Sequence, residues 1–181
     1  MARLDVKNPA WSERGLPPLP TRFGLSTGPT VVGNVGAPSR MLYTGVGDSM
    51  NLASRIEGLN RVYGTRVLVS DTVRAAAGSA FEWREIDRVR VKGKKDAVEI
   101  FEVLGRAGRV PDARLARAAR YEDALSAYRR RDFEAAAALF EPLASGPEGD
   151  VAARRLLESC RGLMRQPPGE DWQATTRFSE K

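Results

Sequence analysis

The chain has 181 residues, of which 42% are hydrophobic and 29% are charged, an ordinary composition for one globular domain with an appendage. It has no histidine and one cysteine, which excludes an internal disulfide, a serine–histidine–aspartate triad and the usual zinc sites. The net charge of +6 fits either an anionic partner, such as a nucleotide, or an arginine-rich solvated surface.

Residues 1–20 are predicted to form a connector, because four prolines between residues 8 and 20 interrupt any regular pattern. The N-terminus lacks the apolar region of a signal peptide, and no apolar run reaches the roughly 20 residues that span a bilayer. With a single cysteine, the chain is expected to be cytoplasmic, and a membrane-anchored longer parent protein stays open.

Two strand-like segments follow the connector, at residues 21–26 and 30–35, and the Thr27-Gly28-Pro29 turn between them predicts a hairpin. The clearest helix covers residues 49–63. Its apolar residues recur at helical spacing and form one stripe: Leu52, Ile56, Leu59 and Tyr63.

After this helix we predict a short strand, a brief helix and two longer strands, at residues 66–69, 71–77, 81–91 and 97–104. The order predicts an α+β fold with helices on one side of a mainly antiparallel sheet. A ferredoxin-like core needs a further strand and helix before Thr21, so we expect a sandwich that lacks its opening elements.

The composition changes at residue 105 and becomes rich in alanine, arginine and leucine. Three helices are predicted, at residues 112–131, 133–144 and 150–164, followed by an extended end at 166–181. The small and aromatic residues around Tyr121 and Phe133 resemble a tetratricopeptide repeat. Because one and a half repeats are too few to be stable alone, we expect this tail to pack on the preceding domain or on a partner helix. We also expect it to be separable from the preceding domain at a linker, residues 105–111.

Several motifs occur in order within residues 21–104. They read GLSTG at 24–28, VGNVG at 32–36, YTGVGDSMNLASR at 43–55, LN at 59–60, YGTRVLVS at 63–70 and VKGK at 91–94. In order and spacing, the block at 21–105 resembles the C-terminal part of the class III adenylyl and guanylyl cyclase catalytic domain. The resemblance implies a dimeric enzyme that converts a nucleoside triphosphate into a cyclic nucleotide and pyrophosphate.

Asn51 and Arg55 are four residues apart in the predicted helix and therefore lie on one face. By resemblance, Asn51 orients the ribose and Arg55 stabilises the charge on the α-phosphate in the transition state. The amide and the planar, permanently charged guanidinium suit these roles. Without the resemblance, both residues would be an ordinary solvated helix edge.

Two further residues are assigned by the resemblance alone. Lys92 ends a strand whose one face is basic, and the resemblance implies that it contacts the terminal phosphates. Thr44 stands at the family's base-selecting position, where threonine goes with adenine. A hydroxyl can accept a hydrogen bond from an adenine amine or donate one to a ring nitrogen.

The family holds two Mg²⁺ or Mn²⁺ ions on two aspartates that precede the strand beginning at Thr21. Nothing before Thr21 matches them, and Asp48 is expected to cap a helix. The chain is therefore expected to supply one half of a site shared with a second copy or a second cyclase domain. Alone, it is expected to be inactive, as a fragment or as a natural short form.

The leading hypothesis is an adenylyl cyclase that converts ATP to cyclic AMP in intracellular signalling. The alternative is an inactive cyclase remnant that serves as an interaction module. An RNA-binding α+β domain is disfavoured, because the aromatic strand motif of an RNA-recognition motif is absent, so no nucleic-acid partner is expected.

Overall fold

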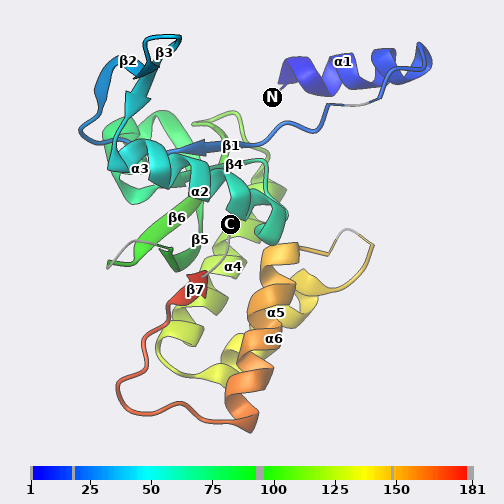
Figure 1. Cartoon of the computed structure of the whole chain (residues 1–181). Coiled ribbons are helices and arrows are strands. Elements are labelled where there is room, and N and C mark those ends of the chain that lie inside the picture. Colours follow the sequence, from blue (N-terminus) through cyan, green and yellow to red (C-terminus); the bar gives the residue numbers. More distant parts are fainter. Residues whose placement is uncertain (1, 18, 93–95, 148, 179–181) are drawn as a thin grey trace.

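The computed structural model describes residues 2–17, 19–92, 96–147 and 149–178 (Figure 1). None of the described helices has the length and apolar character needed to cross a membrane. The elements follow in this order: α1 (Ala2–Glu13), β1 (Phe23–Leu25), β2 (Val31–Ala37), β3 (Arg40–Val46), α2 (Asp48–Tyr63), β4 (Val67–Ser70), α3 (Asp71–Ala77), a 3-10 turn (Gly78–Ala80), β5 (Phe81–Val91), β6 (Val98–Arg106), α4 (Asp112–Arg129), α5 (Phe133–Ala144), α6 (Val151–Arg165) and β7 (Thr176–Phe178).

The main sheet has five strands in the order β1-β4-β6-β5-β7. Its two central pairings, β4 with β6 and β6 with β5, are antiparallel. Both edge strands are short and pair in parallel, β1 with β4 and β7 with β5. The predicted α+β fold is confirmed, and the sheet is mixed because of its two edges.

Helix α2 packs through the stripe that its sequence predicts. Ile56 and Tyr63 are almost fully buried, and Gly64 ends the helix in the left-handed conformation at φ 68°. Strand β1 lies so close to the helix that a Cβ atom on Gly24 would come within 2.2 Å of the backbone nitrogen of Glu57. Only glycine can occupy that position without displacing the helix.

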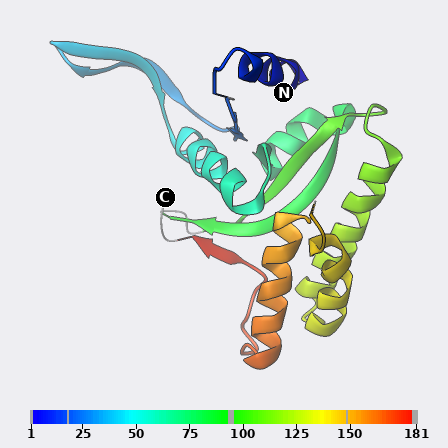
Figure 2. The same ribbon diagram turned by 90° about the vertical axis from the view of Figure 1, so that its right-hand side faces the viewer.

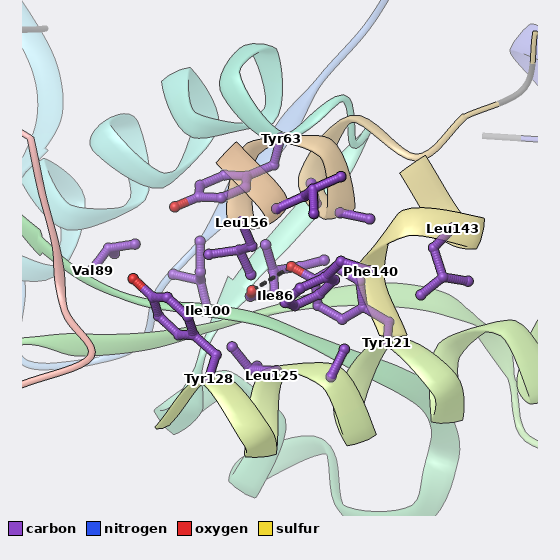
Figure 3. Close-up of a cluster of buried hydrophobic side chains, with 14 of the residues drawn as sticks. Tyr63, Ile86, Val89, Ile100, Tyr121, Leu125, Tyr128, Phe140, Leu143 and Leu156 are labelled. Atoms are coloured by element: carbon purple, nitrogen blue, oxygen red, sulfur yellow. Dashed lines mark hydrogen bonds between the residues drawn. The ribbon is translucent and has the colours of Figure 1, made fainter. Parts of the chain in front are cut away.

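The three tail helices share one hydrophobic core with the sheet (Figure 3). Leu125 and Phe140 pack with Ile86 of the sheet, and the buried Tyr121 hydroxyl donates a 2.7 Å hydrogen bond to the carbonyl oxygen of Ile86. The helices therefore pack on the preceding domain, as predicted. The predicted separability at residues 105–111 stays a prediction. Within this segment Val110 is buried and packs with Leu104 and Ala118 in a small second cluster, which joins the end of β6 to α4.

The predicted hairpin of residues 21–26 with 30–35 is wrong. Strand β2 instead pairs with β3, with Val31 opposite Val46 and Ala37 opposite Arg40. The turn is formed by Pro38 and Ser39, while β1 takes the free parallel edge of β4. Strand β1 has three residues, too few for its sequence to predict which strand it pairs with.

Both ends of the chain contain more regular structure than the sequence predicts. The predicted connector at 1–20 holds α1, in spite of Pro9 inside the helix, and the Asn8 side chain binds the backbone of Leu19. The predicted extended end at 166–181 adds β7 to the sheet, and its residues 179–181 lie outside the described part of the chain. Strand β7 pairs in parallel with β5, which is distant in the sequence, and its three residues are too few to predict that pairing.

Candidate functional site

A cavity of about 420 Å³ lies between helix α2, the end of strand β5 and strand β7. Its lining comes from these three elements and comprises Asn51, Ser54, Arg55, Gly58, Leu59, Val62, Val91, Lys92 and Phe178. Three of the four predicted site residues, Asn51, Arg55 and Lys92, are therefore brought to one place by the fold.

Helix α2 sets the positions of Asn51 and Arg55. It begins at Asp48 with Gly47 as the N-cap, and the backbone N–H of Asn51 donates a 3.2 Å hydrogen bond to the Gly47 carbonyl oxygen. One turn later, Arg55 is partly buried at the cavity wall. Gly58, a further turn along, has no atom within 4 Å of where its Cβ would be, so it leaves the helix surface open beside the cavity.

The charges at the cavity are unbalanced. The lining contains two cations, Arg55 and Lys92, and no carboxylate. Within the described residues, neither cation forms a hydrogen bond or ion pair with its side chain. Two unpaired cations with an amide beside them favour an anionic ligand that carries several oxygens, such as a polyphosphate.

Thr44 is not part of this lining. It lies in β3 opposite Gly33 and is partly buried, on the β2–β3 hairpin rather than on α2 or β5. The structure thus groups the residues predicted to contact the ribose and the phosphates, and leaves the predicted base-selecting residue on a different element.

A buried polar cluster joins the elements that line the cavity. The carboxylate of Asp87, 1% exposed, accepts 2.6 Å hydrogen bonds from the hydroxyls of Tyr63 and Thr176 and a 2.7 Å bond from the Arg88 backbone N–H. Burial raises the pKa of Asp87, and the three hydrogen bonds oppose that rise. The cluster joins α2, β5 and β7, the same three elements that line the cavity.

Sequence reasoning missed Gly58 and Phe178 in the cavity and the buried Asp87. A glycine in the middle of a helix costs about 1 kcal/mol relative to alanine, so Gly58 carried a usable signal. Asp87 carried a weaker one, as a carboxylate within an otherwise alternating strand. Phe178 carried none, since its place depends on a non-local pairing.

The described residues contain no group of three or more histidines, cysteines, aspartates or glutamates that could hold a metal ion. The cavity donors are cations and an amide, which do not fit a hard divalent cation. Asp48 lies in the first turn of α2, where Gly47 and not Asp48 is the cap, so its predicted capping role is wrong.

Comparison with known proteins places these residues in a family. The family described as "Adenylate and Guanylate cyclase catalytic domain" matches residues 5–105, and thus begins before the predicted boundary at residue 21. "Adenylate cyclase 1" of Rhizobium meliloti (strain 1021) is 46% identical over 103 residues, covering 57% of this chain and 16% of that protein. "Adenylate cyclase" of Anabaena cylindrica is 39% identical over 102 residues, covering 55% of this chain and 20% of that protein.

The fold is also similar to a solved structure, the adenylyl cyclase CyaB from P. aeruginosa, with a TM-score of 0.51 and 28% sequence identity. That match covers 61% of this chain and 56% of the other. The chain spans 20% or less of the length of the two curated relatives. The family match nevertheless covers more than half of the chain and includes α2 and the whole of β5. The chain belongs to the adenylate and guanylate cyclase catalytic domain family.

Proposed function

We propose that the chain supplies one half of an adenylyl cyclase site and converts ATP to cyclic AMP and pyrophosphate together with a partner domain. The observation that carries the proposal is the cavity in which Asn51, Arg55 and Lys92 meet. Its volume of about 420 Å³ lies within the usual range for a small-molecule site. The adenylate cyclase relatives support ATP as the substrate.

In this reaction the ribose 3′-oxygen bonds to the α-phosphorus, the bond from that phosphorus to the pyrophosphate oxygen breaks, and the proton of the 3′-hydroxyl passes to water or to the departing pyrophosphate. Negative charge shifts onto the α-phosphate oxygens and the leaving group. Arg55 is proposed to stabilise the α-phosphate charge, Asn51 to orient the ribose, and Lys92 to bind the terminal phosphates. Fixed charges act strongly here because they are in place before the reaction begins.

The family implies Mg²⁺ or Mn²⁺, which would act as a Lewis acid on the triphosphate when bound. The donors at the cavity do not fit such an ion, so the proposal places its ligands on the partner domain. The chain's own contribution is then cationic and complements a partner that provides carboxylates.

The β2–β3 hairpin supports association with a partner. It extends away from the rest of the molecule (Figure 2), and large apolar side chains are exposed on it. Leu42 is 67% exposed and Tyr43 is 73% exposed. Apolar exposure on this scale is typical of an interaction surface. Because Thr44 lies on the same hairpin, its proposed contact with adenine requires the dimer to bring this hairpin to a nucleotide.

A complementation assay tests the proposal. The chain is mixed with a cyclase domain that keeps its metal-binding aspartates but has alanine in place of its own asparagine and arginine. With Mn²⁺ and ATP, the mixture is expected to make cyclic AMP, and each protein alone only a background amount. Replacement of the chain by its Arg55→Ala variant is the matched control and is expected to abolish the gain.

Robust turnover by the isolated chain would contradict the shared site. A folded heterodimer without activity would instead favour the second candidate, a non-catalytic interaction module. The exposed apolar side chains of the hairpin favour this interaction module, because they fit a binding role whether or not the site is catalytic.

A further inference from the structure

The end of strand β5 depends on the C-terminus of the chain. Strand β6 accompanies β5 only as far as Val89, which lies opposite Val98. Beyond that point, in the part of the chain that the structure describes, the partners of Arg90 and Val91 are Arg177 and Phe178 of β7. Lys92 is the next residue, so the backbone that carries the proposed phosphate-binding side chain is held by β7.

Strand β7 ends a well-anchored segment, residues 166–178, which we call the C-terminal strap. Arg131, in the left-handed conformation at φ 67°, donates to the carbonyl oxygens of Pro168 at 2.6 Å and Glu170 at 3.4 Å. The Trp172 ring meets those of Tyr128 and Phe133 edge-on, with centroids 5.5 and 5.3 Å apart. These contacts tie the strap to α4 and α5 before it reaches the sheet.

At the sheet, the strap is fixed by a polar and an aromatic contact. The Thr176 hydroxyl donates to the buried carboxylate of Asp87 at 2.6 Å. The ring of Phe178 lies 6.2 Å from that of Tyr63, and the guanidinium of Arg155 lies 5.3 Å from the centre of the Phe178 ring. Phe178 is thus placed by α2, α6 and β5 together, and Figure 2 shows β7 beside the end of β5.

Phe178 lines the same cavity as Asn51, Arg55 and Lys92. Its ring faces α2, and its backbone pairs with the residue directly before Lys92. We propose that Phe178 is a positioning residue, through which the docked C-terminal strap holds Lys92 where it can bind the terminal phosphates of a nucleoside triphosphate. This inference rests on the proposed function of the cavity and adds a requirement to it: the helical tail must be docked.

The physical reason is the cost of ordering a lysine. Its side chain has four rotatable bonds, and each degree of freedom fixed on binding lowers the affinity. A strand end without a partner adds backbone freedom to this cost. Pairing with β7 removes that freedom in advance, so the phosphate does not have to order the backbone as well as the side chain.

The test is binding of ATP and AMP to the full chain, because only ATP carries the terminal phosphates that Lys92 would contact. Lys92→Ala is expected to weaken ATP binding by about tenfold, the effect of losing one charge-assisted contact, and to leave AMP binding unchanged. Phe178→Ala is expected to do the same. The double variant is expected to be no weaker than Lys92→Ala, since Phe178 acts through Lys92.

Two variants serve as controls. Arg177→Ala, on the same strand with an exposed side chain, should bind both nucleotides as the unaltered chain does. Phe178→Leu keeps an apolar side chain in the cavity and should restore most of the ATP affinity. Circular dichroism melting checks that each variant is folded, and Phe178→Leu decides the matter if Phe178→Ala does not fold.

The outcomes separate the two proposals. If Lys92→Ala weakens ATP binding but Phe178→Ala does not, or if the two effects add, the positioning role is refuted and the proposed function stands. An equal loss of ATP and AMP affinity in Phe178→Ala likewise refutes it, because a merely structural wall would act on both. If Lys92→Ala does not affect ATP binding, the proposed function of the cavity fails first.

Discussion

At the scale of single residues, the site combines side chains that local sequence predicts with one that it cannot. Asn51 and Arg55 are predictable because helical spacing fixes their common face, and the motif around them supplies their roles. Lys92 is predictable as the end of a basic strand within a motif. Phe178 is not, because its place follows from a parallel pairing with a distant strand.

Arg55→Ala is expected to lower kcat in the complemented enzyme by at least about a hundredfold with little change in KM. The guanidinium is proposed to act on charge that exists only in the transition state, and loss of such a contact costs roughly that much. Initial rates of cyclic AMP formation over a range of ATP concentrations measure both constants. Arg61→Ala, on the same helix and outside the cavity lining, is the control. A variant that keeps a near-normal kcat would remove Arg55 from the mechanism.

Asp87 gives a pH-dependent prediction. Burial raises the pKa of the Asp87 carboxyl above the ordinary value of about 3.9. Between that value and the raised pKa, the folded state therefore holds a proton that the unfolded state has lost. The contribution of this group to the free energy of unfolding is full below about pH 3.9 and falls as the pH rises through the raised pKa. Asp87→Asn removes that contribution.

Urea unfolding of the unaltered chain and Asp87→Asn between pH 4 and pH 7 measures this difference. The free energy of unfolding of the unaltered chain, relative to that of Asp87→Asn, should fall as the pH rises. Asp123→Asn, which alters an exposed carboxyl on α4, should show no comparable change. A pH-independent gap for Asp87→Asn would mean that its carboxyl titrates alike in both states.

At the scale of elements, regular periodicity decides what the sequence can predict. Helix α2 is predicted almost residue for residue, and so are the tail helices, because each buries a stripe at helical spacing. Periodicity does not predict which strands pair. Strands β2 and β3 carry apolar residues on both faces. The alternation of apolar and polar residues therefore does not indicate which face is buried, and it does not predict that the two strands pair.

The hairpin is expected to be the main contact with the partner domain. Leu42→Ser, at a side chain that is 67% exposed, should weaken dimerisation by roughly tenfold, the usual effect of removing a large apolar interface residue. Sedimentation velocity over a dilution series measures it. Arg40→Ala on the same hairpin should have a smaller effect, and unchanged association in Leu42→Ser would place the interface elsewhere.

At the scale of the whole molecule, the tail and the cyclase segment share one hydrophobic core. The sequence suggests two parts, because composition changes at residue 105 and the tail resembles a repeat module. Composition does not show which surfaces meet, and here the buried faces of α4, α5 and α6 close over the sheet. The family match ends at residue 105, yet the core that it begins is completed by residues beyond it.

Phe140→Ala tests this unity. Phe140 is fully buried in the tail, so its truncation should destabilise the fold by about 3–5 kcal/mol. Because the core is shared, hydrogen exchange should speed up in β5 and β6 as well as in α5. Leu139→Ala, its 42% exposed neighbour, should change stability by less than about 1 kcal/mol. Faster exchange confined to the tail would show two independent units.

The hydrogen bond from the Tyr121 hydroxyl to the Ile86 carbonyl has a consequence for recombination. A repeat module that is joined by a linker can be moved between proteins, because its core travels with it. This tail shares its core with the sheet, so we expect it to lose stability when it is grafted alone. A chimaera that set these helices on another cyclase sheet would have to carry over the residues beneath them, and exchange during evolution would meet the same barrier. We therefore expect a change in the buried face of one segment to need a compensating change in the other.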